Sequence, residues 1–325
     1  MEHQTVTTNG IQLHVVQDGP VTGPLIILLH GFPEFWYGWR AQIPYLAAAG
    51  FRIWVPDQRG YNLSDKPRAL SAYTLDELAA DVLGLIDAAA QEKAIIIGHD
   101  WGAAVAWWLA AHHPDRLARL IILNVPHPEV MQKQLPRNLR QLFRSWYIFF
   151  FQFPWLPEAL ARWRGWAQVV QALRNSSHPG TFSDDDLEQY RQAWSRPRAY
   201  TSMLNWYRAI VQRQWPLSMP RITVPTLLIW GAQDKFLGRE LAQPSVERCN
   251  DGRLVFIEEA THWVQHEAAA QVNGLIAAFI EGGDGDNLTS HLPHPRMGLR
   301  GSTKDETTGN EHHPFALHSP RLPHL

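Results

Sequence analysis

The chain has a single cysteine among its 325 residues, Cys249. A lone cysteine excludes an internal disulfide and a metal site built from cysteines, and we expect a reducing compartment, the cytoplasm. Positive charge is not in excess either, because 29 Lys and Arg stand against 31 Asp and Glu. The composition therefore gives no reason to expect nucleic acid as a partner.

Long apolar runs are also missing. The most apolar window, residues 147–155, is too short to cross a bilayer and contains Gln152 and Pro154. The opening residues MEHQTVTTNG have neither the basic nor the apolar region of a signal peptide. We expect no obligatory membrane association, although a contact with a membrane surface is neither required nor excluded. The sequence does not indicate the oligomeric state.

Strand-like and helix-like segments alternate along much of the chain. Asn9-Gly10 predicts a tight hairpin within residues 4–17. Further strands are predicted at residues 24–29, 51–56, 94–97, 120–125, 225–231 and 253–258, and helices at residues 36–49, 74–90 and 265–281. This alternation predicts a parallel sheet with right-handed crossovers and helices on its faces.

The pattern changes at Pro126. Residues 127–218 are rich in Trp, Arg and Pro, contain seven of the 15 tryptophans and lack strand-like runs. They predict a helical lid inserted into a core made of residues 1–126 and 219–282. Residues 283–325 show no periodicity and predict a disordered tail.

Gly98-His99-Asp100-Trp101-Gly102 stands between a predicted strand and an Ala-rich predicted helix. Two glycines that flank a central residue allow a sharp turn that exposes the central side chain above the sheet edge. The motif therefore presents Asp100 as a nucleophile. The Gly-x-Asp-x-Gly string alone is weak evidence for a nucleophile. Its position between a predicted strand and a predicted helix strengthens that interpretation.

Two further residues complete a triad in the order that this architecture requires. Asp234 follows one late predicted strand and His262 follows the last, so both are expected at the carboxyl edge of the sheet beside Asp100. The other usual position for the acid holds Asn124, which carries no charge. His99 and His266 compete for the role of base but do not follow a strand end, and an isolated Asp or His has a structural role more often than a catalytic one.

The turn His30-Gly31-Phe32-Pro33 also follows a predicted strand. We expect the backbone N–H of Phe32 to lie beside that of Trp101 and to form an oxyanion hole with it. The remaining expected substrate contacts are His30, Pro33, Trp101 and Trp206. Asp57-Gln58-Arg59-Gly60 is interpreted as a structural turn with an ion pair.

A carboxylate nucleophile points to a particular class of electrophile. Attack by Asp100 on a saturated carbon gives an ester, whereas serine would give an ether that water does not readily cleave. Water activated by His262, with Asp234 orienting the imidazole, can then open the ester. Epoxides and alkyl halides both offer a saturated electrophilic carbon.

The stretches HGFPEFW, GHDWG, FFFQFPWLPE and LNWYRA resemble the epoxide hydrolases of the α/β-hydrolase fold, over about residues 10–281. The resemblance implies a mostly parallel sheet flanked by helices, a helical lid, and no cofactor or metal. It also implies that Tyr147 and Tyr207 hold and protonate the epoxide oxygen, although amphipathic packing is the ordinary role of a single lid tyrosine. Family members commonly carry Gly where this chain has Asn62.

The favoured hypothesis is hydrolysis of a small apolar epoxide with water to a vicinal diol. One alternative is a dehalogenase that uses the same Asp-His-Asp machinery. Haloalkane dehalogenases usually have Asn where this chain has Phe32, and fluoroacetate dehalogenases usually have Arg where it has Trp101. A second alternative is a non-catalytic ligand-binding protein on the same fold.

Overall fold

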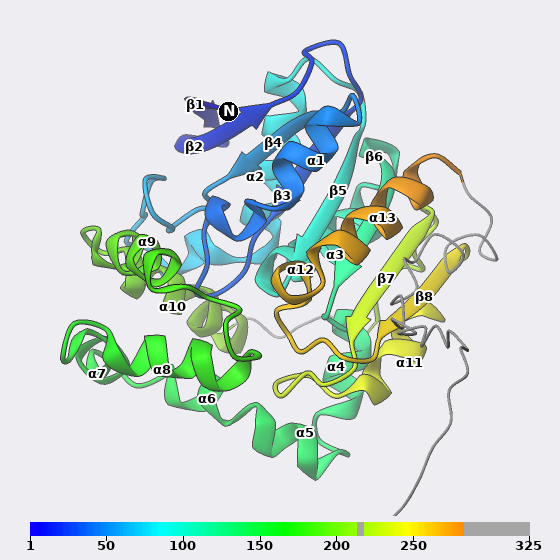
Figure 1. Ribbon diagram of the computed structural model, residues 1–325. Coiled ribbons are helices and arrows are strands. Elements are labelled where there is room, and N and C mark those ends of the chain that lie inside the picture. Colours follow the sequence, from blue (N-terminus) through cyan, green and yellow to red (C-terminus); the bar gives the residue numbers. More distant parts are fainter. Residues whose placement is uncertain (213–217, 283–325) are drawn as a thin grey trace, which may run out of the picture. The chain divides into compact units, whose positions relative to one another are not determined.

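The structure is a computed structural model that describes residues 1–212 and 218–282. The predicted disordered tail, residues 283–325, lies outside the described residues. A sheet of eight strands forms the centre, in the spatial order β1-β2-β4-β3-β5-β6-β7-β8 (Figure 1). All neighbouring strands from β4 to β8 run parallel, as the sequence predicts.

The antiparallel part of the sheet is the predicted hairpin. Strands β1 (Glu2–Thr8) and β2 (Ile11–Asp18) turn at Asn9 and Gly10, which both have positive φ. The parallel strands are β3 (Leu25–Leu29), β4 (Arg52–Pro56), β5 (Ala94–His99), β6 (Leu117–Leu123), β7 (Thr226–Gly231) and β8 (Gly252–Ile257). β3 and β5 are buried on both faces, which explains their continuous apolar runs.

Helices cover both faces of the sheet. α1 (Gln42–Ala48) and α13 (Ala269–Ile280) pack with Ile26 and Leu28 of β3 on one face. α2 (Leu75–Ala88) and α3 (Trp101–His112) pack with Ile27 and Leu29 on the other. Successive β3 side chains thus point into different core layers, as the twofold period of a strand requires.

Two predicted helices are each divided in the structure. Residues 36–49 form a 3-10 turn, η1 (Trp36–Trp39), followed by α1. Residues 265–281 form α12 (Val264–Glu267) and α13, separated at Ala268, whose φ of −124° is not helical. The remaining short elements of this part are η2 (Leu70–Tyr73), η3 (Pro114–Arg116), η4 (Arg239–Leu241) and α11 (Ala242–Val246).

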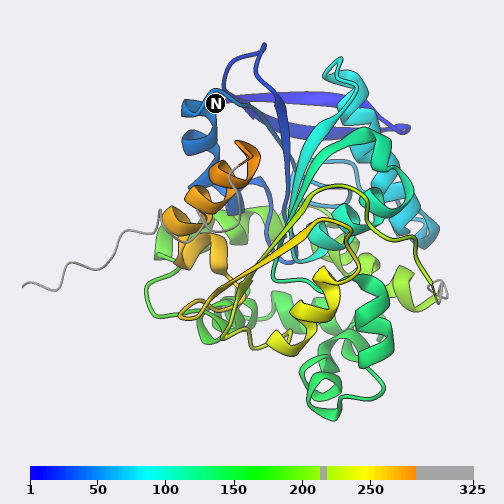
Figure 2. The ribbon, with the colours of Figure 1, turned by 90° about the vertical axis from the view of Figure 1, so that its right-hand side faces the viewer.

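Residues 127–212, between β6 and β7, contain helices joined by short turns and no strand, and we call them the inserted helical segment. Its helices are α4 (Pro128–Gln134), α5 (Leu139–Arg144), α6 (Trp146–Phe150), α7 (Leu156–Arg162), α8 (Ala167–Ser176), α9 (Asp184–Ser195) and α10 (Ala199–Gln212). Figures 1 and 2 show these helices gathered at one end of the sheet. No helix in the described part of the chain is both long and apolar enough to cross a membrane.

Candidate active site

Asp100 occupies the sharp turn between β5 and α3. Its φ of 50° and ψ of −123° lie outside the regions that a residue with a side chain normally adopts. A Cβ on Gly98 would collide with the backbone at Gly102 and Ala103, and a Cβ on Gly102 would collide with the carbonyls of Leu29 and His30. The two glycines therefore permit the close approach that projects Asp100 from the strand end.

The structure brings the three predicted triad residues together. Nδ1 of His262 lies 2.7 Å from Oδ2 of Asp234, and Nε2 of the same ring lies 3.7 Å from Oδ2 of Asp100. Asp234 and His262 are each only 3% exposed. The imidazole of His262 thus lies between two carboxylates, with Nδ1 directed at Asp234 and Nε2 directed at Asp100.

Asp234 is fixed by more than the histidine. Its Oδ1 accepts the backbone N–H groups of Phe236 and Leu237 at 2.7 and 2.9 Å. Its Oδ2 also accepts an N–H from Asn124 at 2.8 Å. Asn124, which carries no charge and cannot serve as the acid, is therefore a hydrogen-bond partner of the acid.

Asn124 reaches Asp234 because β6 ends one residue earlier. The predicted strand 120–125 ends at Leu123, and Asn124 has a φ of 55° that is incompatible with a strand. Its Oδ1 accepts the backbone N–H of Gly231 at 2.9 Å, which holds the side chain across the end of β7. An Asn directly after a buried strand is the one sequence signal that could have indicated this role.

Charge sets the protonation states of the triad. Burial lowers the pKa of His262, but the charges of Asp234 and Asp100 outweigh burial and raise this pKa to about 10. Burial opposes ionisation of Asp100, yet the proximity and positive charge of His262 keep the pKa of Asp100 below its ordinary value. The resting site therefore holds an imidazolium between two carboxylates.

The predicted oxyanion-hole residues flank Asp100. The backbone N–H of Phe32 donates to Oδ1 of Asp100 at 2.6 Å. Trp101 is the first residue of α3, where backbone N–H groups have no partner within the helix. Oδ1 is thus held by the N–H of Phe32, and Asp100 itself is the N-cap residue of α3, where negative charge is favoured.

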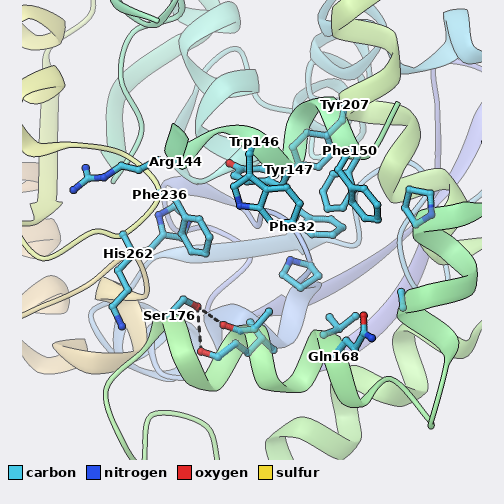
Figure 3. Close-up of a pocket in the computed structure, with 18 of the residues that line it drawn as sticks. Phe32, Arg144, Trp146, Tyr147, Phe150, Gln168, Ser176, Tyr207, Phe236 and His262 are labelled. Carbon is cyan, nitrogen blue, oxygen red and sulfur yellow. Dashed lines mark hydrogen bonds between the residues drawn. The ribbon is translucent and has the colours of Figure 1, made fainter. Parts of the chain in front are cut away.

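Asp100 and His262 line a cavity of about 740 Å³. Figure 3 shows His262 among the residues around it. Its wall is mainly aromatic and aliphatic and comes largely from the inserted helical segment. The residues that line the cavity include Phe32, Pro33, Tyr147, Phe151, Tyr200, Tyr207, Phe236 and Trp263. Such a wall suits an apolar ligand with few polar anchors.

Tyr147 and Tyr207 both line this cavity. They come from α6 and α10, and their rings lie 5.9 Å apart at an angle of 82° (Figure 3). Burial, and then the negative charge of Asp100, raise the pKa of each phenol above its ordinary value. Both groups remain protonated at neutral pH and can donate a hydrogen bond into the cavity.

Of the four predicted substrate contacts, Pro33 lines the cavity in the described part of the chain. His30, Trp101 and Trp206 are not among the residues of its wall. His30 is fully buried, and its Nε2 accepts the backbone N–H of Gln58. The indole of Trp206 donates to the carbonyl of Arg59 beneath the surface. The ring of Trp101 packs against the Tyr207 ring at 4.9 Å, so Trp101 supports the cavity wall from behind.

The competing histidines are engaged elsewhere. Nε2 of His266 lies 2.7 Å from the buried carboxylate of Glu34, and Nδ1 of His99 lies 3.4 Å from it. Nε2 of His99 contacts the backbone carbonyl of His262 at 2.9 Å. Neither ring lines the cavity.

The loop that follows β4 is structural, in agreement with its interpretation from the sequence. Arg59 forms a buried ion pair with Asp81 of α2, with Nη2 of Arg59 at 2.5 Å from Oδ1 of Asp81. Asn62 has a positive φ of 35° and donates to Asp57 at 2.8 Å. Asn tolerates this conformation more readily than most residues with a side chain.

A metal site is not evident in the described residues 1–212 and 218–282. No group of three or more His, Cys, Asp or Glu side chains there is arranged to hold an ion.

Known proteins resemble this chain over almost all of the described residues. A family model described as the alpha/beta hydrolase fold matches residues 24–269. The AB hydrolase superfamily protein YfhM of Bacillus subtilis is 48% identical over 86% of this chain and 97% of its own length. Epoxide hydrolase 4 of Mus musculus is 37% identical, and the alignment covers 85% of this chain and 78% of that protein. The chain belongs to the epoxide hydrolases of the α/β-hydrolase fold.

Two further comparisons agree with this assignment. Epoxide hydrolase A of Mycobacterium tuberculosis is 34% identical over 85% of this chain and 96% of its own. The crystal structure of a Bacillus megaterium epoxide hydrolase in complex with an inhibitor superposes with a TM-score of 0.78 at 30% identity, covering 86% of this chain and all of that one. The family and the fold predicted from the sequence are confirmed.

Proposed function

We propose that the protein hydrolyses apolar epoxides to vicinal diols through an alkyl ester on Asp100. One observation carries this proposal: a strained carboxylate and two protonated phenols, Tyr147 and Tyr207, line the same apolar cavity. A carboxylate is the nucleophile for a saturated carbon, and a phenol supplies the proton that an epoxide oxygen needs as a leaving group. Relatives named as epoxide hydrolases support the same conclusion.

In the first step, Oδ2 of Asp100 attacks one epoxide carbon and the bond between that carbon and the epoxide oxygen breaks. The oxygen takes a proton from Tyr147 or Tyr207. Oδ1 does not attack because the backbone N–H of Phe32 already holds it. The step produces an alkyl ester of Asp100, a free hydroxyl group and a tyrosinate.

Alkylation then changes the protonation of His262. The ester carries no charge, so one of the two carboxylates that raise the pKa of His262 disappears. The imidazolium can now release its proton, which returns the tyrosinate to the phenol. The resulting neutral His262 is the base that the second step requires.

In the second step, Nε2 of His262 removes a proton from water, and the hydroxide adds to the Cγ atom of Asp100. Negative charge develops on Oδ1, where the N–H groups of Phe32 and Trp101 stabilise it. Collapse of this intermediate breaks the ester bond and expels the alkoxide of the product. The alkoxide takes the proton of the carboxylic acid that has formed on Asp100, which releases the diol and restores the Asp100 carboxylate. Asp234 stabilises the imidazolium that has formed.

The inserted helical segment acts as the lid of this reaction. The proposed division assigns residues 1–126 and 219–282 to the core and residues 127–218 to the lid. Tyr147 and Tyr207 both belong to the lid, whereas Asp100 and His262 belong to the core. A lid that closes over the substrate excludes bulk water from the ester and brings the proton donors to the nucleophile.

A single turnover in water enriched in heavy oxygen tests the covalent route. With enzyme in excess over styrene oxide, the label is expected in Asp100, and the diol is expected to be unlabelled. A labelled diol in this first turnover would exclude the ester. Release of halide from haloalkanes without turnover of epoxides would instead favour the dehalogenase, and no turnover of either would favour a binding protein.

A further inference from the structure

Large apolar side chains are exposed together on the inserted helical segment. Of the twelve that are exposed in the described part of the chain, more than half lie within residues 139–163. We call them the exposed aromatic surface, and they are Leu139, Phe143, Trp146, Phe149, Phe153, Trp155 and Trp163, between 55% and 77% exposed. Single exposed apolar residues need no explanation, but a gathering of this kind marks an interaction surface.

The same stretch carries positive charge, unlike the chain as a whole. Residues 130–183 contain seven Lys and Arg and one acidic residue, Glu158, whereas the whole chain has a net charge of −2. Glu158 is buried and pairs with Arg208, so it does not neutralise the exposed cations. Lys133 and Arg174 have carboxylate partners.

The other five cations have no carboxylate within ion-pair distance among residues 1–212 and 218–282. They are Arg137, Arg140, Arg144, Arg162 and Arg164. The guanidinium of Arg164 lies over the ring of Trp163 at 5.1 Å. The aromatic rings and the unpaired arginines are therefore interleaved along one stretch of chain.

The exposed aromatic surface borders the opening of the active-site cavity. Phe143 and Trp146 are more than half exposed, yet both also line the cavity, together with Arg140 and Arg144. Figure 3 labels Trp146 and Arg144. The helices α5, α6 and α7 lie on the side away from β1 and β2 in Figures 1 and 2. The cavity thus opens through a surface that is both apolar and cationic.

We infer that this surface docks on an anionic lipid bilayer with the cavity mouth facing the lipid. Aromatic rings favour the interfacial region of a bilayer, and arginine heads pair with lipid phosphates while their stems stay in apolar surroundings. A second copy of this chain fits the surface less well, because a twofold contact would set the arginines against themselves. Apolar epoxides concentrate in lipid, so this placement shortens their path through water.

Vesicle binding tests the inference without any epoxide, so its outcome is independent of the proposed function. The full chain is sedimented with vesicles of phosphatidylcholine alone and of phosphatidylcholine mixed with phosphatidylglycerol. We expect binding to the mixed vesicles, little binding to the neutral ones, and a loss of binding as salt screens the arginines. Absence of binding to the mixed vesicles would overturn the inference.

Two double variants assign the binding to this surface. Phe149→Ser with Trp155→Ser removes apolar area, and Arg137→Glu with Arg164→Glu reverses charge; none of these residues lines the cavity. Each double variant should weaken binding to anionic vesicles by about tenfold or more. Turnover of an epoxide dissolved in water should stay at the level of the parent protein.

The matched control is Val21→Ser with Leu63→Ser, two other exposed apolar residues that are 74% and 51% exposed. This control should bind vesicles as the parent protein does. Equal loss in the control and the Phe149 and Trp155 variant would contradict the inference. A second result would also contradict the inference: light scattering shows a dimer of the parent protein, the Phe149 and Trp155 variant is monomeric, and the parent protein does not bind vesicles. The partner of the surface would then be a second copy of this chain.

Discussion

The backbone N–H of Phe32 lies 2.6 Å from Oδ1 of Asp100. The donor that we assign to the oxyanion hole therefore already holds an oxygen of the nucleophile before substrate arrives. In the proposed second step that same oxygen carries the developing charge. The donor does not have to move, and a preorganised donor of this kind accounts for a large part of the stabilisation of such an intermediate.

The close approach of Gly31 to Asp100 is necessary for this arrangement. A Cβ at Gly31 would collide with the side chain of Asp100. Gly31→Ala should displace the carboxylate and lower the single-turnover rate by about 10²-fold, the usual effect of a small misplacement.

A helical glycine outside the site provides the control for that change. Gly274→Ala, in α13, meets open space, and it should leave the rate unchanged while it raises the free energy of unfolding by about 1 kcal/mol. Rapid-quench kinetics and urea unfolding measure the two quantities. Parent-like rates in Gly31→Ala would show that the close contact is not needed.

The two tyrosines that line the cavity should share the protonation of the epoxide oxygen. We expect Tyr147→Phe and Tyr207→Phe each to slow ester formation, and the double variant to lose about 10²- to 10⁴-fold, the range typical of a general acid. Pre-steady-state quenching of tryptophan fluorescence follows this step. Tyr73→Phe is the control, because Tyr73 is buried and its hydroxyl donates to the Pro67 carbonyl, away from the cavity. A fully active double variant would remove the tyrosines from the mechanism.

The charge of Asp100 should set the pKa of His262. Asp100→Asn removes one of the two carboxylates that raise this pKa to about 10, so the pKa should fall. Titration of the His262 ring by NMR measures the change, with Asp115→Asn, a distant carboxylate, as the control. An unchanged value in Asp100→Asn would contradict the switch from acid to base that we propose for His262.

The same shift predicts a pH dependence of stability. The pKa of His262 in the folded protein lies above its ordinary value of 6.5, so the protonated ring stabilises the fold fully below pH 6.5. That contribution should decline as the pH rises and be lost above about pH 10. The difference in urea midpoint between the parent protein and His262→Gln should therefore shrink over this interval.

The buried ion pair between Arg59 and Asp81 should be important for stability and not for chemistry. Asp81→Asn leaves the buried guanidinium of Arg59 with only the more exposed Glu77, 3.7 Å away, as a charge partner and should lower the free energy of unfolding by about 3 kcal/mol. Replacing both residues, Arg59→Met with Asp81→Leu, removes both charges and should recover most of that loss. Urea unfolding distinguishes the two results, and a double variant as unstable as Asp81→Asn would show that the pair has another role.

Local signals in the sequence predicted most of the fold. Apolar runs marked the strands, and Gly98 and Gly102 on either side of Asp100 marked the sharp turn, because both are properties of a few neighbouring residues. The limits of elements were less predictable, as the division at Ala268 and the early end of β6 at Leu123 show. Those limits depend on single backbone angles that tertiary packing selects.

By itself, the sequence determined which residues follow strand ends and hence which side chains, Asp100, Asp234 and His262, gather at one edge of the sheet. Only the tertiary structure decided what each of them contacts. It made Asn124 a second hydrogen-bond partner of Asp234 and buried His30 and Trp206 behind the cavity wall. It also left Phe143 and Trp146 exposed where they line the cavity. The contacts of Asn124 with Asp234 and of Trp206 with Arg59 join residues more than a hundred positions apart, and no local pattern encodes them.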